Sequence, residues 1–211
     1  MRLRHVKNAC EIIAQAKNIC YINPISEKGV WKKHFPNSSK IILEVGMGKG
    51  QFLTSIAQNN PDNFYLGMEK MDSVICRAIT KVEEKELSNC ILILGDAEKL
   101  LDYFNEKEID EIYLSFPDPW PKARHEKRRL TSPNFLVKYR TILKEDGIIY
   151  LKTDNASLFE YSLSTMSPLL KNYEKGEIDY QTPKITTEFE DKFRLLREPI
   201  YYLKGQFKEA E

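Results

Sequence analysis

Five carboxylates each follow an apolar stretch of the chain, and this repeated position points to a shared binding edge. The apolar stretches have the length of buried strands, and helical stretches alternate with them between about residues 40 and 166. Ligands bind α/β sheets of this kind outside the carboxyl ends of the strands. Solvation or helix capping explains any one acid, but a series of acids at successive strand ends favours ligand binding. The acids are Glu44, Glu69, Asp96, Asp118 and Asp154.

The first acid precedes a glycine-rich turn, "LEVGMGKG", between a strand and a helix. Glycine suits such a turn because a Cβ atom would obstruct both the turn and an approaching ligand. The acid of the second strand follows the turn by about 20 residues, the spacing at which a carboxylate reaches ribose hydroxyls. Asp96, the acid of the third strand, can accept a hydrogen bond from the exocyclic amine of an adenine. The residues of this predicted nucleoside site are Glu44, Gly46, Gly48, Gly50, Glu69, Asp96 and Ala97.

Dinucleotide oxidoreductases are the main alternative for this half of the chain. Their G-x-G-x-x-G fingerprint places a pyrophosphate at a helix N-terminus. The third glycine of that spacing would stand at position 51, which is Gln51. A carboxylate at Glu44 is poorly placed for a pyrophosphate but suits the amino group or sulfonium of S-adenosylmethionine. We therefore predict S-adenosylmethionine as the cofactor.

Residues 115–130, "SFPDPWPKARHEKRRL", combine a proline-rich loop with a basic run. A residue before a proline is steered to extended conformations, which predicts extended backbone at Phe116, Asp118 and Trp120. The result would be a stiff hook that presents a carboxylate and an aromatic ring. In the simpler alternative, the prolines only end an edge strand and Trp120 packs in the core. This alternative does not explain the aspartate, because a tryptophan in the core needs no neighbouring carboxylate.

The basic run directly after the hook predicts contacts with nucleic-acid phosphates, although a solvated charge run is the usual reading of such a string. Phosphate contacts of this kind set affinity and register without reading sequence. Arg2, Arg4, His5 and Lys7 near the N-terminus could extend the same surface. The run comprises Lys122, Arg124, His125, Lys127, Arg128 and Arg129.

The overall composition is that of one well-cored domain with a small appendage. The chain has 211 residues and a formal net charge of +1, which argues against indiscriminate coating of nucleic acid. No apolar run of about 18 residues and no secretion signal is visible, so we expect a cytoplasmic protein without a membrane partner. The four cysteines form no CxxC pair and the three histidines are scattered, so we expect reduced thiols and no metal.

The alternating elements predict a parallel sheet with helices on both faces. We expect residues 1–35 to be an N-terminal extension, with a helix over about 6–20 that could serve an RNA-contacting arm. Residues 36–211 are expected to form the catalytic domain. Within it, residues 134–147 predict a helix with Gly147 as its C-cap.

Four strings together resemble the bacterial tRNA (guanine-N7-)-methyltransferase family: "LEVGMGKG", "FPDPWPKARHEKRRL", "LKTDN" and "TTEFEDKF". The resemblance spans most of residues 40–193. It implies a Rossmann-like class I methyltransferase fold with a mostly parallel seven-stranded sheet. It further implies S-adenosylmethionine as cofactor and a guanosine of the tRNA variable loop as substrate.

The resemblance also implies roles for individual positions. Glu44, Glu69, Asp96 and Asp118 match cofactor-site acids, and residues 124–129 match an RNA-contacting segment. Ala123 departs from the pattern, where another basic residue is expected, and this weakens the phosphate patch slightly. The positions that match substrate contacts are Lys122, Asp154, Thr187, Glu188, Phe189 and Glu190.

Guanine N7 carries a lone pair and no proton, so its methylation requires no general base. The enzyme would contribute alignment and stabilisation of the charge that develops on the purine. Asp118 is the expected catalytic residue, which accepts hydrogen bonds from the guanine N1–H and amine or lies near the methyl-transfer axis. A methyltransferase of protein or small amines, an oxidoreductase and a catalytically silent RNA-binding protein remain alternatives. Either a monomer or a homodimer is compatible with the sequence.

Overall fold

The computed structural model describes residues 6–179 and 185–209. The chain divides into two units, Met1–Asn105 and Glu106–Glu211. Eight strands lie within the described residues, one more than the seven expected. The expected basic residues Arg2, Arg4 and His5 lie outside the described residues, whereas Lys7 is exposed.

The first unit contains four parallel strands in the order β1-β4-β3-β2. Apart from β1 these strands consist mainly of apolar residues, because a parallel sheet covered on both faces buries nearly every position of a strand. All five residues of β2, for example, are buried. The strands are β1 (Cys20–Ile22), β2 (Ile41–Val45), β3 (Phe64–Glu69) and β4 (Cys90–Leu94).

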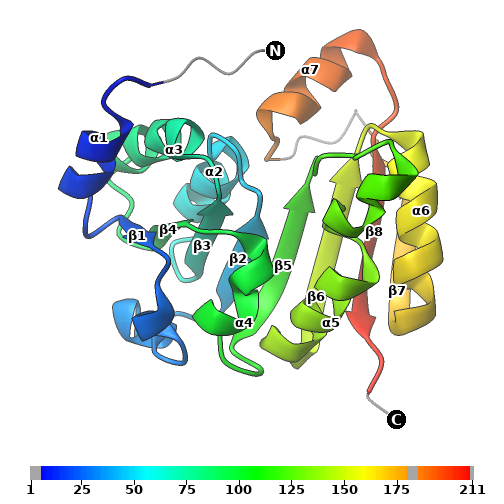
Figure 1. The fold of residues 1–211 in the computed structure, drawn as a ribbon, viewed down its shortest axis with the longest axis horizontal. Coiled ribbons are helices and arrows are strands. Elements are labelled where there is room, and N and C mark those ends of the chain that lie inside the picture. Colours follow the sequence, from blue (N-terminus) through cyan, green and yellow to red (C-terminus); the bar gives the residue numbers. More distant parts are fainter. Residues whose placement is uncertain (1–5, 180–184, 210–211) are drawn as a thin grey trace. The chain divides into compact units, whose positions relative to one another are not determined.

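The N-terminal segment is an integral part of the first unit. Its helix α1 (Ala9–Gln15) packs on α3 (Asp72–Glu84), as Figure 1 shows, and β1 pairs with β4. The helix ends at Gln15 rather than near residue 20, because Cys20–Ile22 takes up strand pairing instead. Trp31 is fully buried, and its Nε1 donates a hydrogen bond to the carbonyl of Tyr103 at 2.9 Å.

The remaining helices of the first unit connect its strands. Helix α2 begins directly after the glycine-rich turn, and a 3₁₀ turn leads from β4 into α4. Two short 3₁₀ turns join β1 to β2. These elements are α2 (Gln51–Asn59), α4 (Leu100–Tyr103), η1 (Ile25–Glu27), η2 (Trp31–His34) and η3 (Ala97–Lys99).

The second unit contains strands in the order β5-β6-β8-β7, with β5 and β6 parallel and the other two pairings antiparallel. The expected α/β pattern is therefore found, with an antiparallel pair at its C-terminal end. The bounds are β5 (Ile109–Ser115), β6 (Leu143–Thr153), β7 (Leu170–Glu177) and β8 (Tyr201–Phe207).

The helices of the second unit are α5 (Pro133–Ile142), α6 (Ala156–Met166) and α7 (Glu188–Leu196), with 3₁₀ turns η4 (Ala123–Arg128) and η5 (Ser167–Leu169). Helix α6 packs along β8, as Figure 1 shows. The predicted capping role of Gly147 is wrong: α5 ends at Ile142, and Gly147 lies within β6. A Cβ atom there would approach the Lys144 carbonyl oxygen to 2.9 Å, so a close backbone approach explains this glycine.

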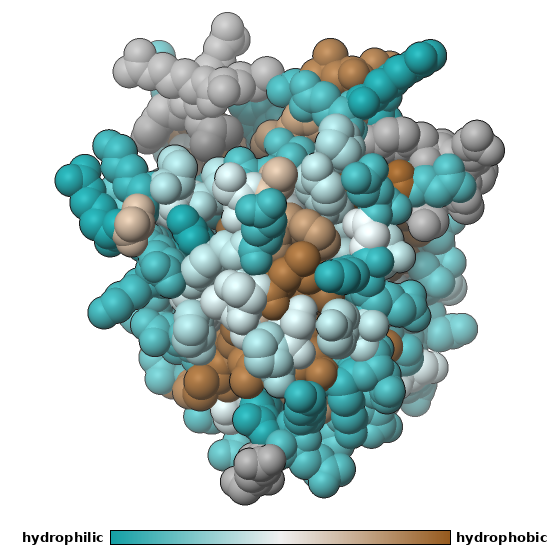
Figure 2. All heavy atoms as spheres, turned by 90° about the vertical axis from the view of Figure 1, so that its right-hand side faces the viewer, coloured by the Kyte–Doolittle hydropathy of each residue, from teal (hydrophilic) through white to brown (hydrophobic). Residues whose placement is uncertain are grey.

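None of the described helices is long and apolar enough to cross a membrane. Hydrophilic side chains predominate on the side of the molecule that Figure 2 presents. Exposed apolar side chains are found on α7, where Phe189 and Leu196 are each 56% exposed and Leu195 is 86% exposed. The apolar atoms of this helix stand at the top of Figure 2.

Candidate functional site

The glycine-rich turn of the first unit has a backbone that favours glycine at each of its three predicted positions. Gly46, Gly48 and Gly50 have φ angles of +75°, +59° and +70°, in the left-handed region that other residues rarely adopt. A Cβ atom on Gly50 would in addition lie 2.9 Å from the Cβ atom of Ala78 in α3. The turn is anchored to β3 through hydrogen bonds from the Gly46 and Met47 amides to the carbonyl of Met68, at 2.9 and 3.0 Å.

Glu69 ties the end of β3 to this turn. Its Oε2 accepts a hydrogen bond from the Gly48 amide at 3.2 Å, and its Oε1 accepts from the amides of Lys70 and Met71 at 2.8 and 3.0 Å. Burial raises the pKa of Glu69 above its ordinary value, although the three amide donors oppose this shift. A carboxylate is therefore held at the sheet edge in a fixed orientation.

The other two acids of the first unit differ in exposure. Asp96 is exposed, and its carboxylate accepts a hydrogen bond from the Glu98 amide at 3.0 Å as the N-cap of η3, with half-buried Ala97 beside it. Glu44 is only 1% exposed and lies one residue before the end of β2. Because β2, β3 and β4 are parallel neighbours, the three acids occupy the same edge of this sheet.

The proline-rich loop of the second unit follows β5, but its backbone is not extended as expected. Phe116 and Trp120 have φ angles of +51° and +40°, so the prediction of extended backbone is wrong at these two residues. Tertiary contacts override the local preference: the Phe116 ring stacks on Phe189 and Phe193 of α7, with centroids 6.1 and 5.9 Å apart. Strained residues of this kind cluster at functional sites.

The hook presents Asp118 to solvent. Among the described residues, none forms a hydrogen bond or ion pair with this exposed carboxylate. Trp120 is half-buried rather than a core residue, with His125 at its edge, 5.5 Å away between ring centroids, and the Arg128 guanidinium 4.9 Å from its ring centroid. The loop therefore holds an accessible carboxylate beside a partly accessible aromatic ring.

The basic run divides into two environments. Its lysines and most of its arginines are exposed in or beside η4, whereas His125 and Arg129 are half-buried. Arg129 donates hydrogen bonds to the carbonyls of Pro119 and Trp120. The exposed members are Lys122, Arg124, Lys127 and Arg128.

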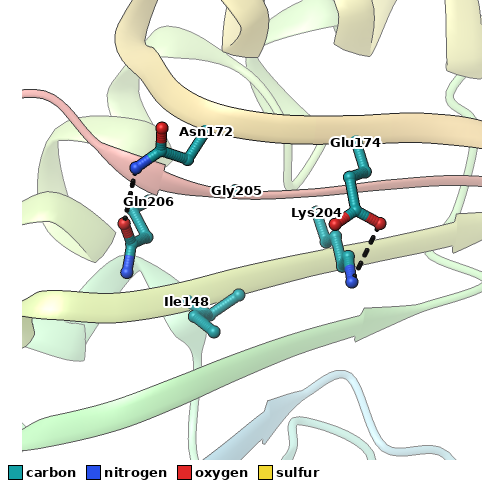
Figure 3. A pocket seen from close by; sticks show the side chains of 6 residues that line it. All are labelled: Ile148, Asn172, Glu174, Lys204, Gly205 and Gln206. Atoms are coloured by element: carbon teal, nitrogen blue, oxygen red, sulfur yellow. Dashed lines mark hydrogen bonds and ion pairs between the residues drawn. The ribbon is translucent and has the colours of Figure 1, made fainter.

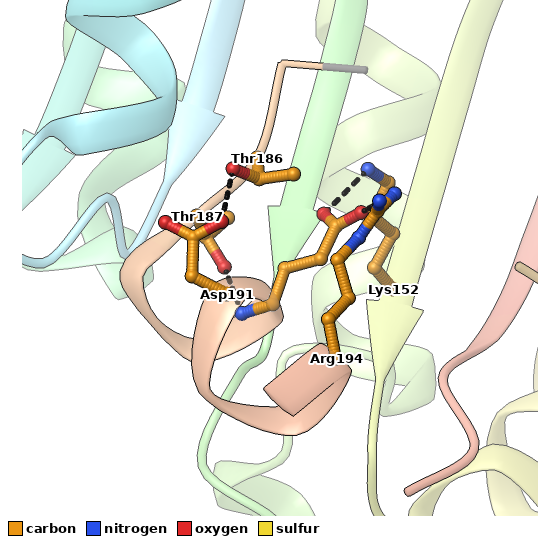
Figure 4. Close-up of polar contacts among 6 residues, drawn as sticks. Lys152, Thr186, Thr187, Asp191 and Arg194 are labelled. Atoms are coloured by element: carbon orange, nitrogen blue, oxygen red, sulfur yellow. Dashed lines mark hydrogen bonds and ion pairs between the residues drawn. The ribbon is translucent and has the colours of Figure 1, made fainter. Parts of the chain in front are cut away.

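The stretch Thr187–Glu190 forms the beginning of α7. The Thr187 hydroxyl caps the helix by accepting a hydrogen bond from the Glu190 amide at 2.9 Å. The Glu190 carboxylate is fully buried between Lys152 Nζ and Arg194 Nη2, at 3.0 and 3.1 Å (Figure 4). Phe189 points outward, and Glu188 is half-buried.

The sequence interpretation missed Lys152 and Arg194, the cations that neutralise Glu190. Both left a signal in the sequence. Lys152 directly follows the apolar run 148–151 of β6, and Arg194 follows Glu190 by four residues, the spacing at which helical side chains meet.

Sequence comparisons identify the relatives of this chain. Residues 38–203 match the family model described as "Putative methyltransferase". The chain is 43% identical to the tRNA (guanine-N(7)-)-methyltransferase of Lachnoclostridium phytofermentans over the full length of both chains. It is 44% identical to the enzyme of the same name from Bacillus subtilis, over 95% of this chain and 96% of that one. The chain belongs to the tRNA (guanine-N7-)-methyltransferase family.

The fold expected for this tRNA (guanine-N7-)-methyltransferase family member is confirmed by solved structures. The crystal structure of the 16S rRNA methyltransferase KamB matches with a TM-score of 0.67, over 85% of this chain and 93% of that one. At 14% identity this likeness concerns the fold alone. The Rossmann-like α/β expectation and the resemblance to the family are both confirmed.

Asp154 of this methyltransferase family member lies directly after β6 and is half-buried. Burial raises the pKa of Asp154, and the negative charge of Glu198 adds to this effect, whereas the positive charge of Lys192 opposes it. The next residue, Asn155, caps α6 by accepting a hydrogen bond from the Leu158 amide at 2.8 Å. The carboxylate is thus placed by the junction between β6 and α6.

A hollow on the sheet of the second unit contains none of the predicted site residues of this methyltransferase family member (Figure 3). Its polar lining is internally paired, with Lys204 Nζ 3.0 Å from Glu174 and Asn172 donating to Gln206 at 3.4 Å. Within residues 6–179 and 185–209, no cluster of three or more potential metal-ligating side chains is found.

Proposed function

We propose that the chain transfers a methyl group from S-adenosylmethionine to N7 of a guanosine in the tRNA variable loop. The observation that supports this most directly is the turn at residues 46–50, in which three left-handed glycines are tied to the carboxylate of Glu69. An acidic, glycine-lined turn suits a nucleoside with a cationic sulfonium and disfavours a pyrophosphate.

The first unit provides donors and acceptors that fit S-adenosylmethionine. Glu69 is oriented to accept hydrogen bonds from ribose hydroxyls. The exposed carboxylate of Asp96, beside Ala97, can accept a hydrogen bond from the exocyclic amine of an adenine. Glu44 places a buried carboxylate next to the turn, where it favours a positively charged amino group or sulfonium. When bound, this cofactor supplies an electrophilic methyl group.

The second unit provides groups for the nucleobase and its RNA. Guanine N7 has a lone pair and needs no deprotonation, so positioning and electrostatics are sufficient for the chemistry. The exposed Asp118 can accept hydrogen bonds from the guanine N1–H and amine, and its negative charge stabilises the positive charge that develops on the ring. Asp154 and the outward-facing Phe189 complete the recognition of base or ribose.

Exposed cations around η4 would bind tRNA phosphates. Lys122, Arg124, Lys127 and Arg128 present their side chains to solvent on one short segment. Phosphate contacts fix the register of the RNA, whereas the base contacts specify the nucleoside.

The test is incubation of the purified chain with methyl-labelled S-adenosylmethionine and unmodified tRNA transcript, followed by nucleoside mass spectrometry. We expect label in 7-methylguanosine, and we expect it to disappear with a transcript whose variable-loop guanosines are replaced by adenosines. Label in another nucleoside, or equal labelling of the altered transcript, would contradict the proposal. A transcript that binds but receives no label would favour a silent RNA-binding protein.

A further inference from the structure

Arg129 differs from the other arginines of the basic run in what it contacts. Its Nε donates to the carbonyl of Pro119 at 3.2 Å and to that of Trp120 at 3.4 Å, and its Nη2 donates to the Trp120 carbonyl at 3.2 Å. Arg124, in the same segment, is exposed and forms no such bonds within the described residues. The donors of Arg129 are therefore directed at the backbone of the proline-rich loop.

The face of the same guanidinium is covered by an aromatic ring. The Cζ atom of Arg129 lies 4.2 Å from the ring centroid of Tyr161, a half-buried residue of α6. Burial, together with the nearby negative charge of Glu126, raises the pKa of Tyr161 to about 12, so the ring stays neutral at physiological pH. A cation over a partly buried ring is stabilised by the ring quadrupole. Arg129 thus connects a rigid helix to the loop.

The loop that Arg129 contacts is strained. Phe116 and Trp120 have positive φ angles although each precedes a proline. Such conformations persist only where the surroundings over-determine them. One side of the loop is held by the stack of Phe116 on α7, and the carbonyls of Pro119 and Trp120 are held by Arg129. Asp118 lies between these two attachments.

We propose that Arg129 is a positioning residue, which fixes the loop at residues 116–121 and thereby orients Asp118, and does not serve as a phosphate contact. This inference rests on the proposed function for its effect on turnover. Arginine is required because its planar fork donates from Nε and Nη2 while its face stacks on Tyr161. A lysine keeps the charge but cannot satisfy both demands, so the charge and the geometry can be separated.

The decisive comparison is Arg129→Lys against Arg124→Gln, with Arg77→Gln on the exposed surface of α3 as control. We expect Arg129→Lys to lower kcat roughly 10- to 100-fold, because small misplacements of reacting groups have effects of this size. The salt dependence of tRNA binding should stay unchanged in this variant and also in Arg129→Gln, which removes the charge. Arg124→Gln should instead reduce the slope of log K against log salt by about 0.7 to 0.9. Arg77→Gln should change neither quantity.

A readout that does not depend on activity keeps the inference separable from the proposed function. The chain has two tryptophans, of which Trp31 is fully buried and Trp120 half-buried, so acrylamide quenching reports mainly on the loop. We expect stronger quenching in Arg129→Lys and in Tyr161→Leu, and wild-type quenching in Tyr161→Phe, which retains the ring. Thermal melting identifies any variant that fails to fold.

Three results would overturn the inference. One is wild-type quenching and kcat in Arg129→Lys, and another is a reduced salt slope in Arg129→Gln equal to that of Arg124→Gln. Additive effects of Arg129→Lys and Tyr161→Leu in the double variant would also contradict it, because residues that act through one contact are coupled. If the wild-type chain methylates no guanosine but the quenching pattern holds, the proposed function fails while the loop assignment stands.

Discussion

Lys152 Nζ lies 3.0 Å from Glu190 Oε2, in a pair that joins β6 to α7 with the carboxylate fully buried. Arg194 Nη2 contacts the other oxygen of Glu190 at 3.1 Å. A buried carboxylate needs such partners, because desolvation of an unpaired charge is strongly unfavourable. The pair therefore contributes, together with the stack of Phe116 on Phe193, to the attachment of α7 within the second unit.

Replacement of Lys152 by methionine should lower the free energy of unfolding by about 2–4 kcal/mol, because it leaves Glu190 with a single cation. Urea denaturation of the two proteins measures this difference. Lys175→Met, at an exposed position of β7, is the matched control and should change stability by less than about 0.5 kcal/mol. Equal effects of the two substitutions would show that the buried pair contributes little.

The glycines of the turn should respond differently to alanine. In Gly48→Ala the added Cβ meets no atom within 4 Å, so only the positive φ is penalised, by about 1 kcal/mol. In Gly50→Ala the Cβ also approaches Ala78 to 2.9 Å, and we expect a further ~1 kcal/mol or more. Chemical denaturation gives the two losses, and calorimetry gives the affinity for S-adenosylmethionine. A greater loss of stability in Gly48→Ala would contradict this ranking.

Glu69 should make stability depend on pH. Its pKa is raised in the folded protein, chiefly by burial, so the folded state favours the protonated form. The resulting stabilisation is complete below the ordinary pKa of a glutamate, about 4.3, and is lost as pH rises through the raised value. Glu69→Gln has no titrating carboxyl group and cannot lose this stabilisation. The free energy of unfolding of the variant relative to wild type should therefore increase as pH rises from about 4.3 through the raised pKa of Glu69. Urea unfolding at a series of pH values tests the sign; a constant difference would refute it.

Removal of the charge on Asp118 should affect turnover far more than cofactor affinity. We expect Asp118→Asn to reduce kcat by roughly 10²-fold or more, the effect typical of a lost electrostatic contact to a transition state. The affinity for S-adenosylmethionine, measured by calorimetry, should remain measurable. Asp146→Asn, at an exposed position of β6, is the control and should behave like wild type. Near-normal turnover of Asp118→Asn would remove this residue from the mechanism.

Three strands of the first unit and the glycine-rich turn were predictable because their signals are local. Continuous apolar runs marked β2, β3 and β4, and the glycines of the turn were recognisable because only their residue type tolerates the required φ angles. The short β1 could not be predicted, since three residues become a strand only through pairing with β4. Gly147 was misassigned for the same reason: its close neighbours include the carbonyl of Asp110, far away in the sequence.

The sequence by itself determined the residue types at the candidate site. These are the acids that follow successive strands, the glycine-rich turn preceded by an acid, and an aspartate that is flanked by prolines and followed by cations. Only the tertiary structure decided which of these groups face solvent and which hold one another. It directed Arg129 to the carbonyls of its own loop and the buried Glu190 to two half-buried cations, and it imposed positive φ angles on Phe116 and Trp120. These outcomes depend on partners distant in the chain, and local preferences yield where packing and burial contribute more free energy.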